Sequence, residues 1–486
     1  MKNQTRREFL ENSMLATAAT VAAGSAAMPA SLADEKQTDS LSERLRVAVI
    51  GIRGRGQSHL SAFLGRSDCE VVAVVDPDEA IGQAKGVERV QKEQGKAPAY
   101  YRDMRHAMDD QSIDIVSIAT PNHWHALAAI WAVQSGKDVY VEKPVSHNVS
   151  EGRRIVQAAR KYDKIVQTGT QCRSTGGSRA AIDYIRAGEI GDVNLARGLC
   201  YKGRGPIGEK GSYDVPTSVD YDLWSGPAPK KLLTRPRLHY DWHWHWDTGN
   251  GDLGNQGIHQ MDLARWGLGV NDIGQGVVSY GGRLGYTDAG QTANTQVSVI
   301  DYGDKTLVFE VRGLKTDSLR GAKVGVIFYG SEGYVVLNSY NGGNAFDLDG
   351  NVIETFSAGG DHYANFINCV RSRNVADLHA DIEEGHLSSA LCHLGNISYR
   401  LGGKVSTGEA AERLAGNAEA TETLQRVTSH LSENNVDLEK TKLQFGAQLA
   451  LNGKAETFTG ELADEANARL TRDYRRPFVV PSAVDI

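Results

Sequence analysis

The chain has 486 residues and a formal net charge of −7. This length is enough for two or three domains. No basic stripe runs along the sequence, which argues against nucleic acid as a partner. The five cysteines are scattered, odd in number and without metal-ligand spacing, so we predict neither a disulfide framework nor a metal site.

The N-terminal end has the features of a twin-arginine export signal. Residues 5–10 read T-R-R-E-F-L, an alanine-rich segment follows at 14–27, and residues 31–33 (S-L-A) form a small-residue cleavage site. The apolar run is too short for a membrane-spanning helix. Because the twin-arginine translocase carries folded proteins, we expect a periplasmic or other extracytoplasmic location and a cofactor loaded in the cytoplasm.

Residues 46–76 contain a dinucleotide-binding pattern. The apolar residues 47–50 predict a buried strand, residues 51–56 (G-I-R-G-R-G) a glycine turn, and a helix follows. Residues 71–75 predict a second buried strand that ends at Asp76. A strand, a glycine turn, a helix, a strand and an acid in this order form a βαβ unit that binds a dinucleotide.

Each part of this unit has an expected role. The glycines permit a tight turn and let backbone N–H groups approach a pyrophosphate at the helix N-terminus. Asp76 lies 20 residues after Gly56 and is placed to accept hydrogen bonds from a ribose diol. This acid favours NAD over NADP, with Arg53 or Arg55 folding over the adenosine end as the alternative. The candidate cofactor residues here are Gly51, Arg53, Gly54, Arg55, Gly56 and Asp76.

The alternation of strands and helices continues, with further buried strands expected at residues 113–119, 138–141 and 165–168. This predicts a parallel sheet covered on both faces. Because parallel strands deliver their carboxyl ends to one edge, the glycine turn should meet residues 120–125 and 142–144 there.

After residue 170 the pattern changes. Residues 203–251 are irregular, residues 253–268 predict one helix, and strand patterns dominate residues 277–338. The fold class is therefore α/β, with an open, mostly antiparallel sheet in the second domain. The expected organisation is a signal peptide (1–33), a Rossmann NAD-binding domain (45–170), a substrate-binding α/β domain (171–405) and a C-terminal extension (406–486).

These motifs occur together in one known family. They are V-I-G-I-R-G-R-G (49–56), Val75-Asp76, T-P-N-H-W-H-A (120–126), V-E-K-P (141–144) and G-D-L-G-N-Q-G-I-H-Q-M-D (251–262). Over about residues 45–405 the chain resembles the Gfo/Idh/MocA oxidoreductases, which include glucose–fructose oxidoreductase and inositol dehydrogenase.

The resemblance implies a catalytic pair. Lys143 would lie beside the nicotinamide and the reacting hydroxyl, and His259 would accept the proton. Oxidation of an alcohol needs a base within hydrogen-bond reach, and a lysine cation stabilises the developing alkoxide. The family's cofactor-lining residues correspond to Thr120, Pro121, Asn122, His125, Glu142 and Lys143.

The chain departs from the family's Asp-x-x-x-His pattern, because Asn255 stands four residues before His259. An asparagine can orient the ring or bind a hydroxyl, but it cannot offset an imidazolium charge. Asp262 lies one helical turn after His259. Three roles are open for it: it offsets the imidazolium charge, it is structural, or it binds substrate. Arg173 is another candidate for substrate contact.

Residues 242–247 read W-H-W-H-W-D. In an extended segment the three indoles would share one face, where Trp246 and its neighbours could stack on a sugar ring. Core packing is the alternative, and metal binding by the two histidines is least favoured.

The sequence thus predicts an exported NAD-dependent oxidoreductase that acts on a hydroxyl of a sugar, polyol or glycoside, with a tightly bound cofactor. One alternative is a redox-neutral, NAD-dependent glycoside hydrolase of the same family. Another is a catalytically degenerate protein that binds sugar or nucleotide. A homodimer or homotetramer is expected, because the family commonly assembles through its large sheet.

Overall fold

The computed structural model describes residues 43–486, so the predicted signal peptide (1–33) lies outside the described residues. Within residues 43–486, no helix combines the length and apolar character needed to cross a membrane.

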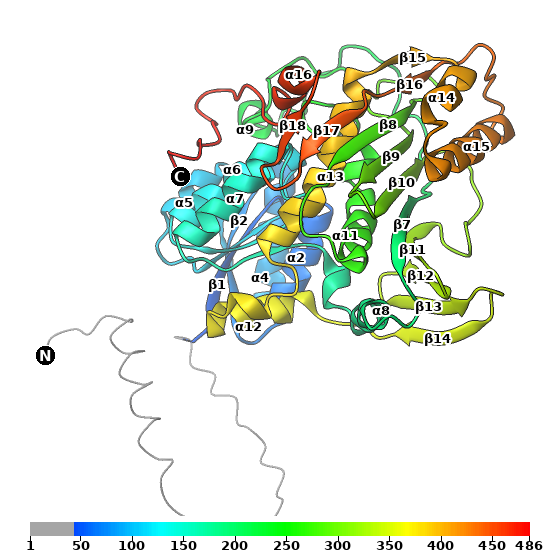
Figure 1. Ribbon diagram of the computed structural model, residues 1–486. Coiled ribbons are helices and arrows are strands. Elements are labelled where there is room, and N and C mark those ends of the chain that lie inside the picture. Colours follow the sequence, from blue (N-terminus) through cyan, green and yellow to red (C-terminus); the bar gives the residue numbers. More distant parts are fainter. Residues whose placement is uncertain (1–42) are drawn as a thin grey trace, which may run out of the picture. The chain divides into compact units, whose positions relative to one another are not determined.

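Six parallel strands form the first sheet, in the order β3-β2-β1-β4-β5-β6. Figure 1 labels β1 and β2 of this sheet. Short β-branched runs build it, since its central strands are buried on both faces. This confirms the predicted Rossmann fold. The strands are β1 (Leu45–Ile50), β2 (Cys69–Val75), β3 (Ala99–Tyr101), β4 (Ile115–Ile118), β5 (Asp138–Val141) and β6 (Val166–Thr168).

Helices cover both faces of this sheet. The helix α6 (Asn122–Gln134) is buried along almost its whole length, which explains its nearly uninterrupted apolar sequence. The helix α3 (Glu79–Ile81) continues through a π-helical turn into α4. The other helices of this domain are α2 (Arg55–Leu64), α4 (Glu88–Gln94), α5 (Met104–Asp109) and α7 (Val149–Lys161). After β6, α8 (Gly176–Arg186) packs on the second sheet.

The second sheet has twelve strands and is mostly antiparallel, as predicted, with β7 and β10 as a parallel pair. Its main path is β14-β13-β12-β11-β7-β10-β9-β8-β16-β15. The strands are β7 (Val193–Cys200), β8 (Gly276–Gly282), β9 (Thr295–Asp301), β10 (Thr306–Arg312), β11 (Val324–Gly330), β12 (Gly333–Ser339), β13 (Gly342–Asp347), β14 (Val352–Ser357), β15 (Gly403–Val405), β16 (Leu443–Phe445), β17 (Leu449–Asn452) and β18 (Thr457–Thr459).

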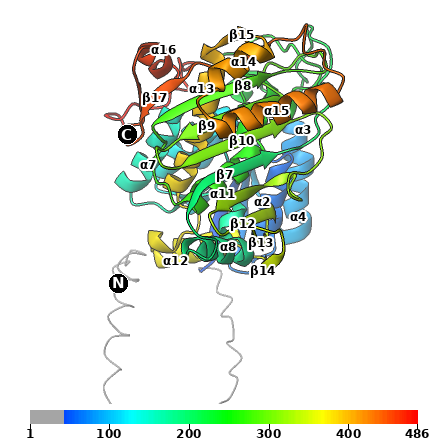
Figure 2. The same cartoon turned by 45° about the vertical axis from the view of Figure 1, so that its right-hand side comes forward.

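Helices pack on both faces of the large sheet. On one face α11 (Gly257–Leu268) and α13 (Ile382–Leu401) share the main apolar core with the strands. On the other face lie α14 (Thr407–Leu414) and α15 (Ala418–Glu433), and Figure 2 shows α15 running across β9 and β10. Residues 406–486, expected as an extension, thus contribute strands to the sheet and cover it.

The chain returns twice to the Rossmann domain. Side chains of α12 (His362–Ser372), such as Phe366, join a core with β1 and β4. Beyond α16 (Ala463–Asn467), the last residues cross α6, where Phe478 packs edge-on against Trp124 with ring centroids 5.3 Å apart. Both returns tie the two sheets into one unit, Arg44–Ile486.

Candidate active site

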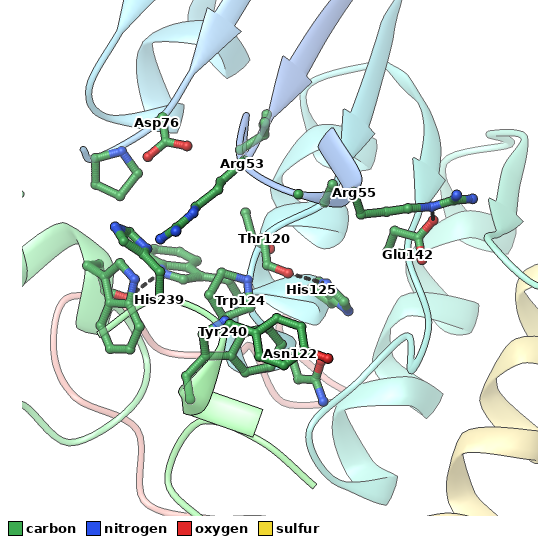
Figure 3. Close-up of a pocket in the computed structure, with 18 of the residues that line it drawn as sticks. Arg53, Arg55, Asp76, Thr120, Asn122, Trp124, His125, Glu142, His239 and Tyr240 are labelled. Atoms are coloured by element: carbon green, nitrogen blue, oxygen red, sulfur yellow. Dashed lines mark hydrogen bonds and ion pairs between the residues drawn. The ribbon is translucent and has the colours of Figure 1, made fainter. Parts of the chain in front are cut away.

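A cavity of about 700 Å³ lies at the carboxyl edge of the parallel sheet (Figure 3). Loops that follow β1, β2, β4 and β5 form one side, and residues of the second domain form the other. The structure therefore brings together the three loops that the sequence placed at one edge. The predicted residues that line the cavity are Gly51, Arg53, Gly54, Arg55, Asp76, Thr120, Pro121, Asn122, His125, Glu142, Lys143, Asn255 and His259.

The glycine turn has a backbone that only glycine fits. Gly51 has φ +84°, and a Cβ there would lie 2.6 Å from the carbonyl oxygen of Ala119. A Cβ at Gly56 would lie 1.8 Å from the carbonyl oxygen of Gly51. Gly56 therefore lies beneath the turn and permits its close contact with α2. The turn is a cradle into which a pyrophosphate fits.

Asp76 is held in one orientation at the end of β2. Its Oδ2 accepts a hydrogen bond from the Ile52 N–H at 2.8 Å, and its Oδ1 accepts one from the Asp78 N–H at 2.9 Å. Burial raises the pKa of Asp76 to about 6. Each oxygen keeps a lone pair for a ribose hydroxyl, so the carboxylate fits the adenosine ribose of NAD.

The two arginines of the turn point in different directions. In Figure 3, Arg53 reaches across the cavity on the side of Asp76, whereas Arg55 points toward Glu142. The Arg55 Nε donates to Glu142 Oε1 at 2.8 Å. The alternative in which Arg55 folds over the adenosine end is therefore wrong, because this ion pair holds the side chain at the other end.

Glu142 and His125 organise the loops after β4 and β5. Burial alone would raise the pKa of Glu142, but Arg55 and His59 hold it well below its usual range. The His125 ring bridges the two loops, with Nε2 2.8 Å from the Thr120 carbonyl oxygen and Nδ1 2.6 Å from that of Pro144. Burial lowers the pKa of this histidine.

Lys143 is anchored by a break in a helix. The expected single helix over 253–268 is wrong: α10 (Gly251–Gly254) ends just before Asn255, and α11 begins at Gly257. In a continuous helix the Asn255 carbonyl would accept the His259 N–H, which instead donates to the Gln256 carbonyl at 3.3 Å. The freed Asn255 oxygen accepts from Lys143 Nζ at 2.7 Å.

His259 provides an unpartnered nitrogen beside this lysine. The residue is 5 % exposed, and among the described residues its Nδ1 has no hydrogen-bond partner. Burial lowers the pKa of His259 well below its usual value, and the Lys143 charge adds to this shift. A neutral ring with an unused nitrogen can accept a proton from a bound hydroxyl.

Two predicted substrate residues do not reach the cavity. Arg173 Nε donates to both carboxylate oxygens of Asp262, at 2.8 and 3.0 Å, and the Ser388 hydroxyl donates to Asp262 at 2.7 Å. Arg173 and Asp262 are buried and line no part of the cavity. Since Arg173 already neutralises Asp262, this carboxylate is structural and does not offset a charge on His259.

The aromatic run at 242–247 is also not extended. Residues Asp241–Trp244 form a 3₁₀ helix, so the three indoles do not share a face. Trp242 lines the cavity, whereas Trp244 is buried beside Ile207. The predicted contact of Trp246 with substrate is wrong, because its ring lies away from the cavity under the Arg400 guanidinium, 5.0 Å from its centroid.

Residues 216–240 cover the adenosine half of the cavity, and no sequence motif predicted this. We call this segment the roof. Its backbone pairs with the loop after β2, where the Asp220 N–H donates to the Pro77 carbonyl at 2.8 Å. His239 Nε2 lies 2.9 Å from Asp78 Oδ2, which adds a second tie. Arg475 then holds the roof from the C-terminal end, donating to Asp222 Oδ1 at 2.9 Å and to the Gly226 carbonyl at 3.0 Å.

Two tyrosines also line the cavity without having been predicted. The Tyr240 hydroxyl accepts from Arg204 Nη1 at 3.0 Å, and the Tyr340 hydroxyl accepts from Gln256 Nε2 at 2.7 Å. The rings of Tyr340 and His259 have centroids 5.2 Å apart. Neither tyrosine carries a motif in the sequence, so only the packing of distant segments identifies them.

Among residues 43–486, no group of three or more His, Cys, Asp or Glu side chains is arranged to hold a metal ion.

Solved structures show the class of fold. The WlbA dehydrogenase from Bordetella pertussis, in complex with NADH and UDP-GlcNAcA, matches with a TM-score of 0.55 and 18% identity over 73% of this chain and 97% of that one. GenD2 from gentamicin A biosynthesis, in complex with NAD, matches with a TM-score of 0.51 and 18% identity over 73% of this chain and 93% of that one. At these identities the likeness concerns the fold alone, a Rossmann domain joined to an α/β sheet domain.

Family models then identify the chain more closely. The model described as an oxidoreductase family with an NAD-binding Rossmann fold matches residues 45–170. The model of the same family's C-terminal alpha/beta domain matches residues 204–434. The chain therefore belongs to the Gfo/Idh/MocA oxidoreductase family, and its cofactor is NAD.

Curated relatives are similar over a shorter segment. An alpha-N-acetylgalactosaminidase from Shewanella oneidensis is 33% identical over 207 residues, which are 40% of this chain and 45% of the relative. A glycosyl hydrolase family 109 protein from Shewanella baltica is 30% identical over the same shares. The chain thus matches less than half the length of these relatives.

Proposed function

We propose that the protein catalyses NAD-dependent hydride transfer at a hydroxyl-bearing carbon of a sugar, polyol or glycoside. The observation that carries this proposal is the placement of Lys143 and His259, which both line the cavity that contains the dinucleotide cradle. When bound, NAD supplies a hydride acceptor. His259 takes the hydroxyl proton, and the Lys143 ammonium, anchored by Asn255, stabilises the developing alkoxide charge.

A second candidate function is glycoside cleavage without net oxidation, in which NAD is reduced and reoxidised within each cycle. The names of the curated relatives favour it, since one is called an alpha-N-acetylgalactosaminidase. The same pair, Lys143 and His259, would serve its oxidation step. A third candidate is a degenerate protein that binds sugar or nucleotide without turnover. The substrate panel described below distinguishes it from the two enzymatic functions.

We further propose that NAD stays bound between turnovers. The roof at residues 216–240 closes over the adenosine half, and it is tied to the loop after β2 and to Arg475. A cofactor enclosed in this way can leave only after several of the contacts that hold the roof have broken. Such retention suits an exported enzyme, because free NAD is scarce outside the cytoplasm.

Export and assembly remain predictions. The twin-arginine motif at residues 5–10 supports export through the twin-arginine translocase to the periplasm or a similar compartment. The helices α14 and α15 cover one face of the large sheet at β8–β10, so a second copy could not pack directly on those strands there. This limits the sheet surface open to a second copy.

The test is a panel of sugars, polyols and nitrophenyl glycosides, followed both by nicotinamide absorbance and by phenol release. We expect at least one substrate to reduce the bound nucleotide, and we expect Lys143→Ala and His259→Ala to abolish that signal. Turnover that survives both substitutions contradicts the assignment of catalytic residues. Phenol release without accumulation of reduced nucleotide would indicate glycoside cleavage. Neither signal with any substrate of the panel would indicate a protein that binds sugar or nucleotide without turnover.

A further inference from the structure

Tyr340 is a cavity residue to which hydride transfer assigns no role. It lies in the turn between β12 and β13, and 37 % of it is exposed. The turn is held firmly, because the Tyr340 carbonyl accepts from Thr175 Oγ1 at 2.9 Å and from Ser178 Oγ at 3.2 Å. Its ring lies beside that of His259, and its side chain is thus fixed near the catalytic pair.

A chain of hydrogen bonds from Lys202 through Gln256 to Tyr340 determines the direction in which the Tyr340 hydroxyl can donate its proton. An ammonium only donates, so Gln256 must present Oε1 to Lys202 Nζ, which lies 3.0 Å away. The amide nitrogen of Gln256 then faces Tyr340 and donates to its hydroxyl oxygen at 2.7 Å. Because this oxygen already accepts, and no described residue is seen to accept its proton, the O–H is available as a donor to a ligand in the cavity.

We propose that Tyr340 is the general acid that protonates the departing oxygen in glycoside cleavage. This role rests on the second candidate function of the previous section. It also separates the two functions chemically, because oxidation of an alcohol has no leaving group and needs no such acid. Tyr340 is then a catalytic residue of the cleavage step, with Gln256 and Lys202 as positioning residues.

The cleavage step balances as follows. Once the sugar hydroxyl has been oxidised to a ketone and His259 has passed its proton to water, the C–H next to the carbonyl is acidic, and His259 removes that proton. The C–H electron pair forms a C=C bond while the C–O bond to the aglycone breaks. The departing oxygen keeps that bonding pair and takes the proton of Tyr340, which becomes a phenolate.

Addition of water restores both residues. The water hydroxyl bonds to the carbon that lost the aglycone, and the water proton returns to the Tyr340 phenolate. His259 gives its proton back to the neighbouring carbon, where the C=C electron pair forms the new C–H bond. The ketone is finally reduced by the stored hydride and a proton from water, so the whole cycle consumes one water.

The test compares leaving groups of different basicity on the whole enzyme. The substrates are methyl and p-nitrophenyl glycosides of the sugar with the highest turnover in the panel, beginning with N-acetyl-α-galactosamine. A nitrophenolate leaves readily without protonation, whereas a methoxide does not. General acids contribute about 100-fold or more, so Tyr340→Phe should lower kcat/KM about 100-fold for the methyl glycoside and less than about 3-fold for the nitrophenyl one. Its single-turnover rate of NAD reduction should stay unchanged.

Two variants complete the design. Tyr334→Phe makes the same chemical change on β12, where the ring stacks on Phe346 outside the cavity, and it should change neither substrate's turnover. Lys202→Met leaves the phenol in place but releases the Gln256 amide, so it should give a smaller loss on the methyl glycoside only. If Tyr340→Phe loses activity equally on both glycosides, or reduces NAD more slowly, the general-acid role of Tyr340 is overturned and the second candidate function is not. A wild-type protein that oxidises sugars and cleaves no glycoside overturns the second function and the proposal with it.

Discussion

The Lys143 ammonium donates a hydrogen bond of 2.7 Å to the carbonyl oxygen of Asn255. This contact joins the loop after β5 to the break between α10 and α11, and it uses the backbone of residue 255 rather than its side chain. The asparagine in the family's aspartate position is therefore compatible with a correctly placed lysine. We expect Asn255→Ala to retain the anchor of Lys143.

Removal of the lysine should abolish chemistry without releasing the cofactor. Loss of one preorganised charge at a developing alkoxide costs about 100-fold or more in turnover, so Lys143→Ala should lower kcat/KM by at least that factor. The nucleotide released on denaturation should remain at the wild-type amount. Lys92→Ala, on the exposed surface of α4, is the control and should behave as wild type. A Lys143→Ala enzyme with more than a tenth of wild-type activity contradicts the assignment.

The folded protein should lose stability as the pH falls below about 6. Burial lowers the pKa of His123, His243 and His393 to about 3 each. Since an unfolded histidine titrates near pH 6.5, the unfolded state binds more protons below that pH, and the free energy of unfolding decreases as the pH falls. Each histidine should cost about 2 kcal/mol at pH 5 relative to pH 7.

Urea unfolding at pH 7 and at pH 5 measures this loss. His123→Gln, whose side chain stays neutral at both values, should show a smaller difference between them than wild type. Equal free energies of unfolding of the wild-type protein at the two pH values would rule out buried neutral histidines.

Loosening the roof should speed the loss of NAD. Arg475 donates to Asp222 and to the Gly226 carbonyl, so Arg475→Ala removes a tie that holds residues 216–240. We expect NAD to leave at least about tenfold faster, since three charge-assisted hydrogen bonds are lost. Dilution of loaded protein into a nucleotide scavenger measures the rate. The exposed neighbour Arg476 provides the control, Arg476→Ala; identical release from both variants contradicts a retaining role for the roof.

Asp76 should set the preference for NAD. Its carboxylate is oriented by the Ile52 and Asp78 amides and would repel a 2′-phosphate. The near-isosteric change Asp76→Asn keeps one acceptor oxygen and removes the charge, so affinity for NAD should fall about tenfold while the discrimination against NADP narrows. Titration of nucleotide-free protein with each dinucleotide checks this. Unchanged discrimination would assign the preference to another residue, with Arg53 as the first to examine.

The sequence predicts this fold well where local pattern and burial agree. The buried β-branched runs at β1, β2, β4 and β5 alternate with helical segments, which favours a parallel sheet whose loops converge. Asp76 follows from its place at the end of the second strand, whereas Lys143 and His259 were expected only because their motifs resemble those of the family.

The remaining features depend on contacts between distant segments. The glycines at 251, 254 and 257 weaken a continuous helix around Asn255, but only the distant Lys143 shows what its carbonyl binds. Trp246 was assigned from an extended segment, but a 3₁₀ turn at 241–244 redirects the run. Tyr340 and Arg475 act through partners more than 80 residues away, and no local spacing signals such pairs.

The central claim is that this cavity performs hydride transfer to NAD at a sugar carbon. The most direct measurement is a single-turnover record of nicotinamide absorbance after the NAD-loaded protein is mixed with each substrate of the panel, for wild type and for Lys143→Ala. We predict a rise in reduced nicotinamide with at least one sugar or glycoside in the wild type, and no rise in the variant. A wild-type protein that carries NAD and shows no reduction with any substrate, or a variant that matches the wild-type rise, would contradict this account.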